Sequence, residues 1–193
     1  MKKIIIYISP LLVSIFVMAI SFNDVLWINF WGFFNAPPQL PPFSDLDAIA
    51  KALNAKEEGL NPYFDNPYDL KNKTYVYPSI WLHFFDLFNL NQKINFQVFN
   101  FILIYFYTFI YFKLSLEVNK YSFSIILCIL FLSSANMLVI ERLNIEIIIF
   151  ILIYWLATSE SFKSKFILYL TAVYAKLYPI FAVFIFLRNK KIL

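Results

Sequence analysis

Five apolar runs constrain the fold of this chain more than any other feature. Each approaches the roughly 20 residues that a helix needs to cross a bilayer, and they cover residues 4–22, 96–112, 121–140, 143–157 and 166–187. Lipid offers no partner to backbone amides, so these runs must be helical. The chain is 61% apolar and 15% charged, whereas soluble domains are about 45–50% apolar and about 25% charged. The sequence therefore predicts an all-α polytopic membrane protein, a single membrane domain over residues 1–193, with about five transmembrane or re-entrant segments.

Basic residues at the ends of these runs predict the topology. Lys2 and Lys3 precede the first run, which has no small-residue cleavage site, so we expect an uncleaved helix with a cytoplasmic N-terminus. The formal net charge of +4 arises from bases at segment ends, which indicates a bilayer and no nucleic-acid partner. The run 166–187 has bases at both ends. It is either a re-entrant hairpin of two half-helices or an ordinary span.

A long extracytoplasmic loop is predicted over residues 23–77, because it is rich in aromatic, proline and acidic residues. Within it, residues 45–58 are predicted to form an amphipathic helix that ends at Gly59. Its apolar residues fall within one stripe that can lie on the membrane or on the helix bundle: Leu46, Ile49, Ala50 and Leu53.

Two carboxylates, Asp45 and Asp47, begin this amphipathic helix. On a helix they lie about 200° apart, so they cannot jointly hold a metal ion. Ser44 followed by Asp47 fits an acidic variant of the capping box, which favours a capping role for Asp47. A carboxylate at the outer membrane face can instead act as a general base towards a hydroxyl group. No metal or cofactor is predicted.

The stretch "IERLNIEIIIF" places four polar residues between apolar spans: Glu141, Arg142, Asn144 and Glu146. Polar groups at membrane depth are costly and indicate function. Arg142 and Glu146 are four residues apart, so one interpretation is a structural ion pair on one helix face. The other is a guanidinium that faces a cavity and binds a phosphate.

Lys176, beside Tyr178 and Pro179, interrupts the last apolar run. Either the Lys176 side chain extends so that its ammonium group reaches the membrane interface, or a broken helix holds the ammonium group at membrane depth, where it can bind an anion. His83 is the single histidine, so it offers little material for a zinc site and is either an interfacial packing residue or a substrate contact. Gly32 and Gly59 are too few for a phosphate-cradling loop.

Four segments in this order carry a family resemblance: "SDLDAIAKAL", "YVYPSIW", "ERLNIEIIIF" and "KLYPIFAVFIFL". Together with a first helix and an outer loop, they resemble the polytopic GT-C glycosyltransferases. The chain is most similar to the group around glycosyltransferase family eighty-seven, which includes polyprenyl-phosphate-mannose-dependent mannosyltransferases. The resemblance implies that this chain corresponds to the N-terminal half of such an enzyme.

The resemblance also implies a reaction and residue roles. The enzyme would transfer a hexose such as mannose from a polyprenyl-phosphate sugar to a lipid or glycan acceptor of the cell envelope, on the outer side of the bacterial cytoplasmic membrane. Asp45 would be the general base, with Asp47 as the fallback. Arg142, Asn144, Lys176 and Tyr178 would line the donor. The alternative is a non-catalytic membrane assembly or flippase-like protein, and a transporter ranks last.

Overall fold

Every regular element of the computed structural model is a helix in the ranges it describes, which are residues 2–69, 74–117 and 121–187. The all-α prediction is therefore confirmed for these ranges. In chain order the elements are α1 (Lys2–Ile20), α2 (Asp24–Phe33), α3 (Ser44–Glu57), α4 (Ser79–Leu87), α5 (Lys93–Glu117), α6 (Tyr121–Phe131), α7 (Ser134–Arg142), α8 (Glu146–Thr158), α9 (Phe162–Ala175) and the 3₁₀ helix η1 (Tyr178–Leu187). Residues 70–73 of the predicted outer loop lie outside the described part.

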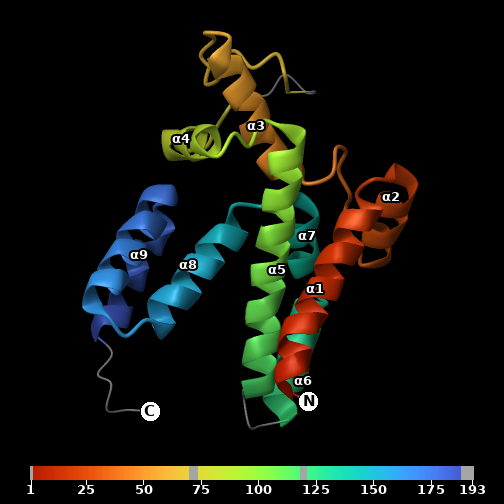
Figure 1. Ribbon diagram of the computed structural model, residues 1–193, viewed down its shortest axis with the longest axis vertical. Coiled ribbons are helices and arrows are strands. Elements are labelled where there is room, and N and C mark those ends of the chain that lie inside the picture. The colour runs from red at the N-terminus through yellow and green to blue at the C-terminus, as the bar shows by residue number, and fades with distance from the viewer. Residues whose placement is uncertain (1, 70–73, 118–120, 188–193) are drawn as a thin grey trace.

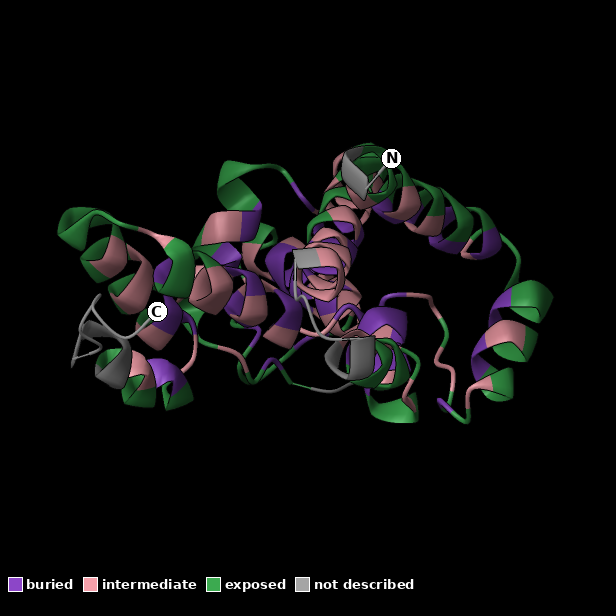
Figure 2. Cartoon of the chain, turned by 90° about the horizontal axis from the view of Figure 1, so that it is seen from below, coloured by how far each residue is buried: buried purple, intermediate pink, exposed green. Residues whose placement is uncertain are grey.

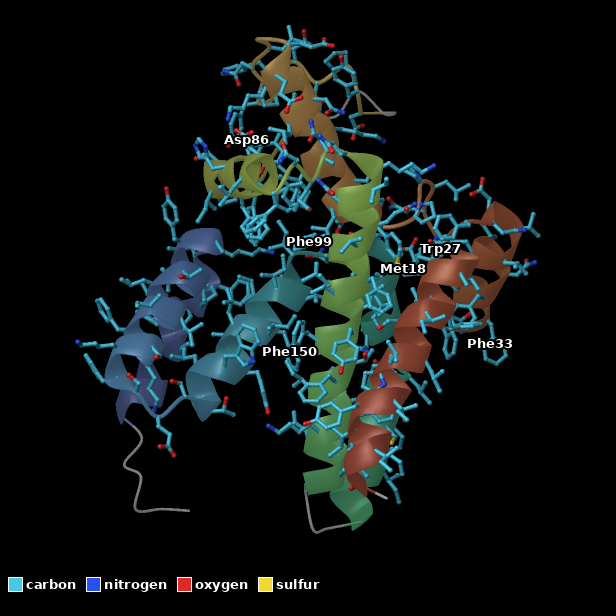
Figure 3. The ribbon with its side chains drawn as sticks, in the orientation of Figure 1. Met18, Trp27, Phe33, Asp86, Phe99 and Phe150 are labelled. Atoms are coloured by element: carbon cyan, nitrogen blue, oxygen red, sulfur yellow. The ribbon has the colours of Figure 1, made fainter. Side chains whose placement is uncertain are left out.

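Helices α1 and α5 pack along each other in opposite directions and form the most extensive helix pair (Figure 1). Helix α8 packs between α5 and α9. The short helices α3 and α4 lie beyond the end of this bundle at which α5 begins (Figure 1). Aromatic rings fill the junction of α8 with α5, where Phe150 meets Tyr107 and Tyr111 (Figure 3).

Two of the five apolar runs are broken in the structure. The run 121–140 forms α6 and α7, bent by 53°, because the Ser133 side chain caps a new helix at Asn136. The run 166–187 ends its α-helix at Ala175, and Lys176 is extended. Helix η1 then returns alongside α9, and the Tyr169 hydroxyl donates to the Ile180 carbonyl at 3.1 Å (Figure 1). The run therefore forms a hairpin of two helices, while its position as a re-entrant membrane segment stays a prediction.

The predicted amphipathic helix of residues 45–58 is confirmed as α3. Its predicted stripe is buried, and Leu46, Ile49 and Leu53 are at most 1% exposed. This face packs against α4 and α7, so the helix anchors to protein. Gly59 follows the helix at φ 82°, a conformation that favours glycine. The preceding aromatic segment is also helical: α2 buries Trp27 and Trp31 and exposes Phe33 (Figure 3).

Length and composition identify one helix in the described ranges that is long and apolar enough to cross a membrane, Lys93–Leu116. A second is counted if the bent pair Ser124–Phe131 and Ser134–Arg142 forms one span. Two further apolar helices, Ile4–Ile20 and Glu146–Thr158, are shorter. The arrangement with about five membrane segments therefore stays a prediction.

Candidate functional site

Polar residues from three separate helix ends meet at one place in the structure. The ends are the start of α3, the turn between α7 and α8, and the break between α9 and η1. We call the five residues that join them the polar cluster, and its members are linked by hydrogen bonds or an ion pair: Asp45, Asn144, Glu146, Lys176 and Tyr178. Four of these were predicted as site residues, and Glu146 was considered only as a pairing partner.

Asn144 connects the α7–α8 turn to the start of α3. Helix α7 ends because Leu143 adopts a left-handed conformation, with φ 46° and ψ 55°. The Asn144 Oδ1 atom then accepts the Glu146 amide at 3.1 Å, which satisfies a free donor at the start of α8. Its Nδ2 atom donates to Asp45 Oδ2 at 2.7 Å. One amide side chain therefore starts α8 and orients the Asp45 carboxylate.

Glu146 connects α8 to the α9–η1 break. One carboxylate oxygen accepts the Lys176 ammonium, and the other accepts the Tyr178 hydroxyl. Lys176 also lies 5.7 Å from the centre of the Tyr178 ring. The side chains of Lys176 and Glu146 are 38% and 34% exposed, so solvent reaches both charges. Lys176 therefore has a defined partner on another helix.

Tyr77 faces the cluster from the segment before α4. Burial raises the pKa of its phenol to about 12, and the negative charges of Asp45 and Glu146 act in the same direction, while Arg142 opposes them. The phenol therefore stays protonated at neutral pH and keeps its hydrogen-bond donor. Its only sequence signal was its place in the segment "YVYPSIW".

The predicted ion pair between Arg142 and Glu146 is wrong. Four-residue spacing places two residues on one face only within a continuous helix, and Leu143 ends that helix between them. The Arg142 Nε atom lies instead 3.7 Å from Glu141 Oε2. Neither of these two buried atoms makes a hydrogen bond within the described part of the chain.

Glu141 was noted as polar but given no role, and the structure buries it completely. Its Oε1 atom accepts the Gln39 amide at 2.7 Å and the Trp27 indole at 3.3 Å. Its backbone carbonyl accepts the Phe43 amide at 3.2 Å. Glu141 therefore fastens residues 36–43, the segment that leads into α3 and Asp45, onto α7.

The predicted capping role of Asp47 is also wrong. Helix α3 begins one residue earlier than a Ser44 cap requires, with Phe43 at the N-cap in a left-handed conformation. The Ser44 hydroxyl is buried without a hydrogen-bond partner in the described structure. Asp47 pairs with Lys51, one turn further along, at 2.6 Å. Burial nevertheless raises the pKa of Asp47, against the opposing effect of Lys51.

His83 is not a member of the polar cluster. It is on the exposed side of α4, whose other side buries Trp81 and Phe85. No hydrogen bond or ion pair joins it to the cluster in the described ranges. The predicted substrate contact therefore has no geometric support, although packing at an interface fits its exposure.

A cavity of about 210 Å³ lies beside the start of α3. One wall is the first turns of α3, with Asp45, Asp47 and Lys51. The opposite wall comes from residues 74–77 and from Asn66. Of the polar cluster, only Asp45 lines this cavity, so the same carboxylate contacts Asn144 and borders a space open to a ligand.

This part of the structure offers the Asp45 carboxylate, the basic side chains of Arg142 and Lys176, and the protonated phenol of Tyr77. Such a set can accept a proton and stabilise an anion. Within the described ranges, no three His, Cys, Asp or Glu side chains are grouped so that they could hold a metal ion.

Comparisons with known proteins identify no relative. No protein-family model, no curated protein and no solved structure matches the chain.

Proposed function

We propose that this chain is a membrane glycosyltransferase, or the N-terminal half of one, that transfers a hexose such as mannose from a polyprenyl-phosphate sugar to an envelope lipid or glycan. The observation that carries the proposal is the 2.7 Å hydrogen bond between Asp45 and Asn144. This bond brings Asp45, the proposed base, to the α7–α8 turn, where Asn144 stands two residues from Arg142 and two residues from Glu146.

The residue roles follow from the chemistry of the transfer. Asp45 accepts the proton of the acceptor hydroxyl while that oxygen attacks the anomeric carbon of the donor sugar. Asn144 is a positioning residue, because its amide orients the Asp45 carboxylate. Arg142 and Lys176 offer positive charge to the phosphate that leaves, and Tyr178 and Tyr77 offer hydroxyl donors. Asp47 is the fallback base.

A membrane location for this site is supported by the distribution of charge over the helix ends. The described parts of residues 23–92, which are 23–69 and 74–92, lie with the adjoining helix ends at one end of the bundle (Figure 1). This segment contains eight of the 12 acidic residues: Asp24, Asp45, Asp47, Glu57, Glu58, Asp65, Asp69 and Asp86. The other end holds the start of α1, the end of α5 and the start of α9, with Lys113, Lys163 and Lys165. This asymmetry favours an acidic outer face and a basic cytoplasmic face.

Exposed apolar side chains on the outer helices support the same location. The peripheral faces of α1, α6 and α9 are largely exposed (Figure 2). Their exposed residues are mostly large and apolar, and they include Ile4, Ile8, Leu12, Ile15, Ile125, Ile129, Phe166, Ile167 and Leu170. Soluble proteins rarely leave apolar patches of this extent in water. We therefore propose an integral protein of the bacterial cytoplasmic membrane, with lipid on these faces.

Transfer of labelled hexose tests the function directly. The chain is reconstituted in vesicles with polyprenyl-phosphate hexose and an envelope lipid extract. We expect Asp45→Asn to reduce transfer by about 100-fold to 10,000-fold, the range for loss of a general base. Asp65→Asn, an exposed residue outside the site, is the matched control and should keep full transfer. If Asp47→Asn abolishes transfer and Asp45→Asn does not, the roles of the two acids are exchanged; if neither changes it, the proposed mechanism is refuted.

A non-catalytic membrane assembly or flippase-like protein is the second candidate. The observation that favours it is the internal pairing of the cluster: both carboxylate oxygens of Glu146 already have partners in Lys176 and Tyr178. In that case the cluster would fasten three helix ends together and contact no substrate. Retained cellular function of the Asp45→Asn variant, with no transfer by the parent chain, would favour this candidate.

A further inference from the structure

The carbonyl of Ala175, the last residue of α9, lacks the donor that a continuing helix would supply. In an α-helix this carbonyl would accept the amide of the residue four positions on. That residue is Pro179, which has no amide hydrogen. Ala175 is only 4% exposed, so little solvent reaches it, and a buried carbonyl without a partner is costly. The end of α9 therefore needs a donor from another part of the structure.

Trp81 supplies this donor from α4. Its indole Nε1 atom donates to the Ala175 carbonyl at 3.2 Å, across 94 residues of sequence. Trp81 is itself 4% exposed, and the ring of Phe84 packs edge-on against it, with 6.1 Å between the ring centres. Helix α4 contacts α9 and lies beside the end of that helix (Figure 1). The indole is therefore a buried donor, held by α4 where α9 ends.

The Ala175 carbonyl belongs to the same peptide group as the Lys176 amide. That amide makes the last bond of α9, to the Ala172 carbonyl at 3.1 Å, and the Lys176 backbone is then extended, with φ −160° and ψ 136°. From this position the ammonium group pairs with Glu146 on α8. Because a peptide group is planar, a bond that fixes its carbonyl also fixes its amide. The bond from Trp81 therefore orients the backbone from which the Lys176 side chain extends.

We infer that Trp81 is a positioning residue for Lys176. Its indole replaces the amide that Pro179 lacks, and it acts on Lys176 through the shared peptide group. This structural link stands independently of any activity. Its value for catalysis rests on the proposed function, in which Lys176 offers positive charge to the phosphate that leaves.

Amide hydrogen exchange of the full chain in lipid nanodiscs tests the structural link without requiring turnover. Trp81→Phe keeps an aromatic ring and removes the donor. We expect the Lys176 amide to exchange about tenfold faster, the factor that corresponds to about one net hydrogen bond. Trp31→Phe is the matched control, because Trp31 is 1% exposed and its indole nitrogen has no partner in the described structure. It should leave exchange at Lys176 unchanged.

Pro179→Ala provides a rescue, because it restores an amide at the position that an α-helix uses. In a chain with both Trp81→Phe and Pro179→Ala, exchange at Lys176 should return towards the parent value. If Trp81→Phe alone does not fold, the added amide should restore folding. Unchanged exchange at Lys176 in Trp81→Phe, equal acceleration in Trp31→Phe, or no recovery in the double variant would overturn the inference.

The hexose-transfer assay tests the catalytic part. Trp81→Phe should lower kcat about tenfold and leave the acceptor KM unchanged, which is less than the roughly 100-fold that misplacement by about 1 Å can cost. In a Lys176→Met background, Trp81→Phe should cause no further loss, because it acts through Lys176. Unchanged transfer in Trp81→Phe, or a full additional loss in that background, would overturn the positioning role. Faster exchange at Lys176 with no transfer by the parent chain would instead keep the structural link and refute the transferase.

Discussion

Replacing the buried Glu141 by leucine should release Gln39 from α7, while the bundle stays folded and Phe43 stays attached. The Gln39 amide donates to the Glu141 carboxylate at 2.7 Å, and hydrogen bonds to charged groups contribute about 1.5–3 kcal/mol. The substitution costs the Trp27 indole less hydrogen-bond energy, because the indole also donates to the Gln39 carbonyl at 3.2 Å. Taking about 2 kcal/mol for the lost bond, local opening at Gln39 should become about 30-fold more frequent.

Amide hydrogen exchange measures this opening residue by residue. In the Glu141→Leu variant we expect the Gln39 amide to exchange about 30-fold faster. The Phe43 amide should change little, because it donates to the Glu141 backbone carbonyl, which the substitution keeps. Glu141→Gln is the control, since it keeps a neutral acceptor oxygen and should give a smaller acceleration. Unchanged exchange at Gln39 would refute the role of Glu141, and equal acceleration at Phe43 would show that the whole segment opens.

Two further predictions concern Asp47 and the topology. The pKa of Asp47 is raised above 3.8 in the folded chain, so the stability it contributes is present below pH 3.8 and is lost as the pH rises through the folded pKa. As the pH rises through this window, the thermal midpoint of Asp47→Asn should therefore increase relative to that of the parent. A difference between the two midpoints that does not change with pH would contradict this prediction. In a Cys128→Ser background, an impermeant thiol reagent added outside intact cells should label Asp65→Cys and Leu177→Cys, but not Ser161→Cys. Labelling of Ser161→Cys from outside would refute the proposed orientation.

Helix α3 was predictable because its determinants are local. The apolar spacing at Leu46, Ile49 and Leu53 repeats with the helical period, and Gly59 fits the positive φ that ends the segment. The all-helical class followed from the long apolar runs. In each case the pattern lies within one segment and needs no information about neighbours.

The helix breaks were harder to predict, because the residues at them carry weak local signals. Leu143 adopts a left-handed conformation that favours glycine, and its side chain is fully buried. Packing of that side chain therefore holds a turn that the residue type does not favour. The break after α6 was missed for a related reason: Ser133 lies in an apolar run, and its sequence neighbours do not mark it as the N-cap that it is in the structure.

The pairing within the site depended on these breaks. Arg142 and Glu146 would share a face of a continuous helix, but the turn at Leu143 redirects Glu146 to a residue 30 positions away, Lys176. Sequence spacing suggested one pairing, Arg142 with Glu146, whereas the structure pairs Arg142 with Glu141 and Glu146 with Lys176. Tyr77 and Glu141 had no predicted role because their function in the structure comes from contacts across helices.

The polar cluster has a physical consequence for either proposed function. Its contacts join the start of α3, the start of α8 and the α9–η1 break, so each helix end is held partly by a residue of another. Lys176 is paired with Glu146, and its side chain is 38% exposed. A phosphate that reached Lys176 would compete with the Glu146 carboxylate. The net binding free energy would therefore be only the difference between the Lys176–phosphate and Lys176–Glu146 ion pairs. A donor would therefore have to bind through several groups at once, with Arg142 and the tyrosine hydroxyls adding to Lys176, because one exposed ion pair is worth at most about 1 kcal/mol.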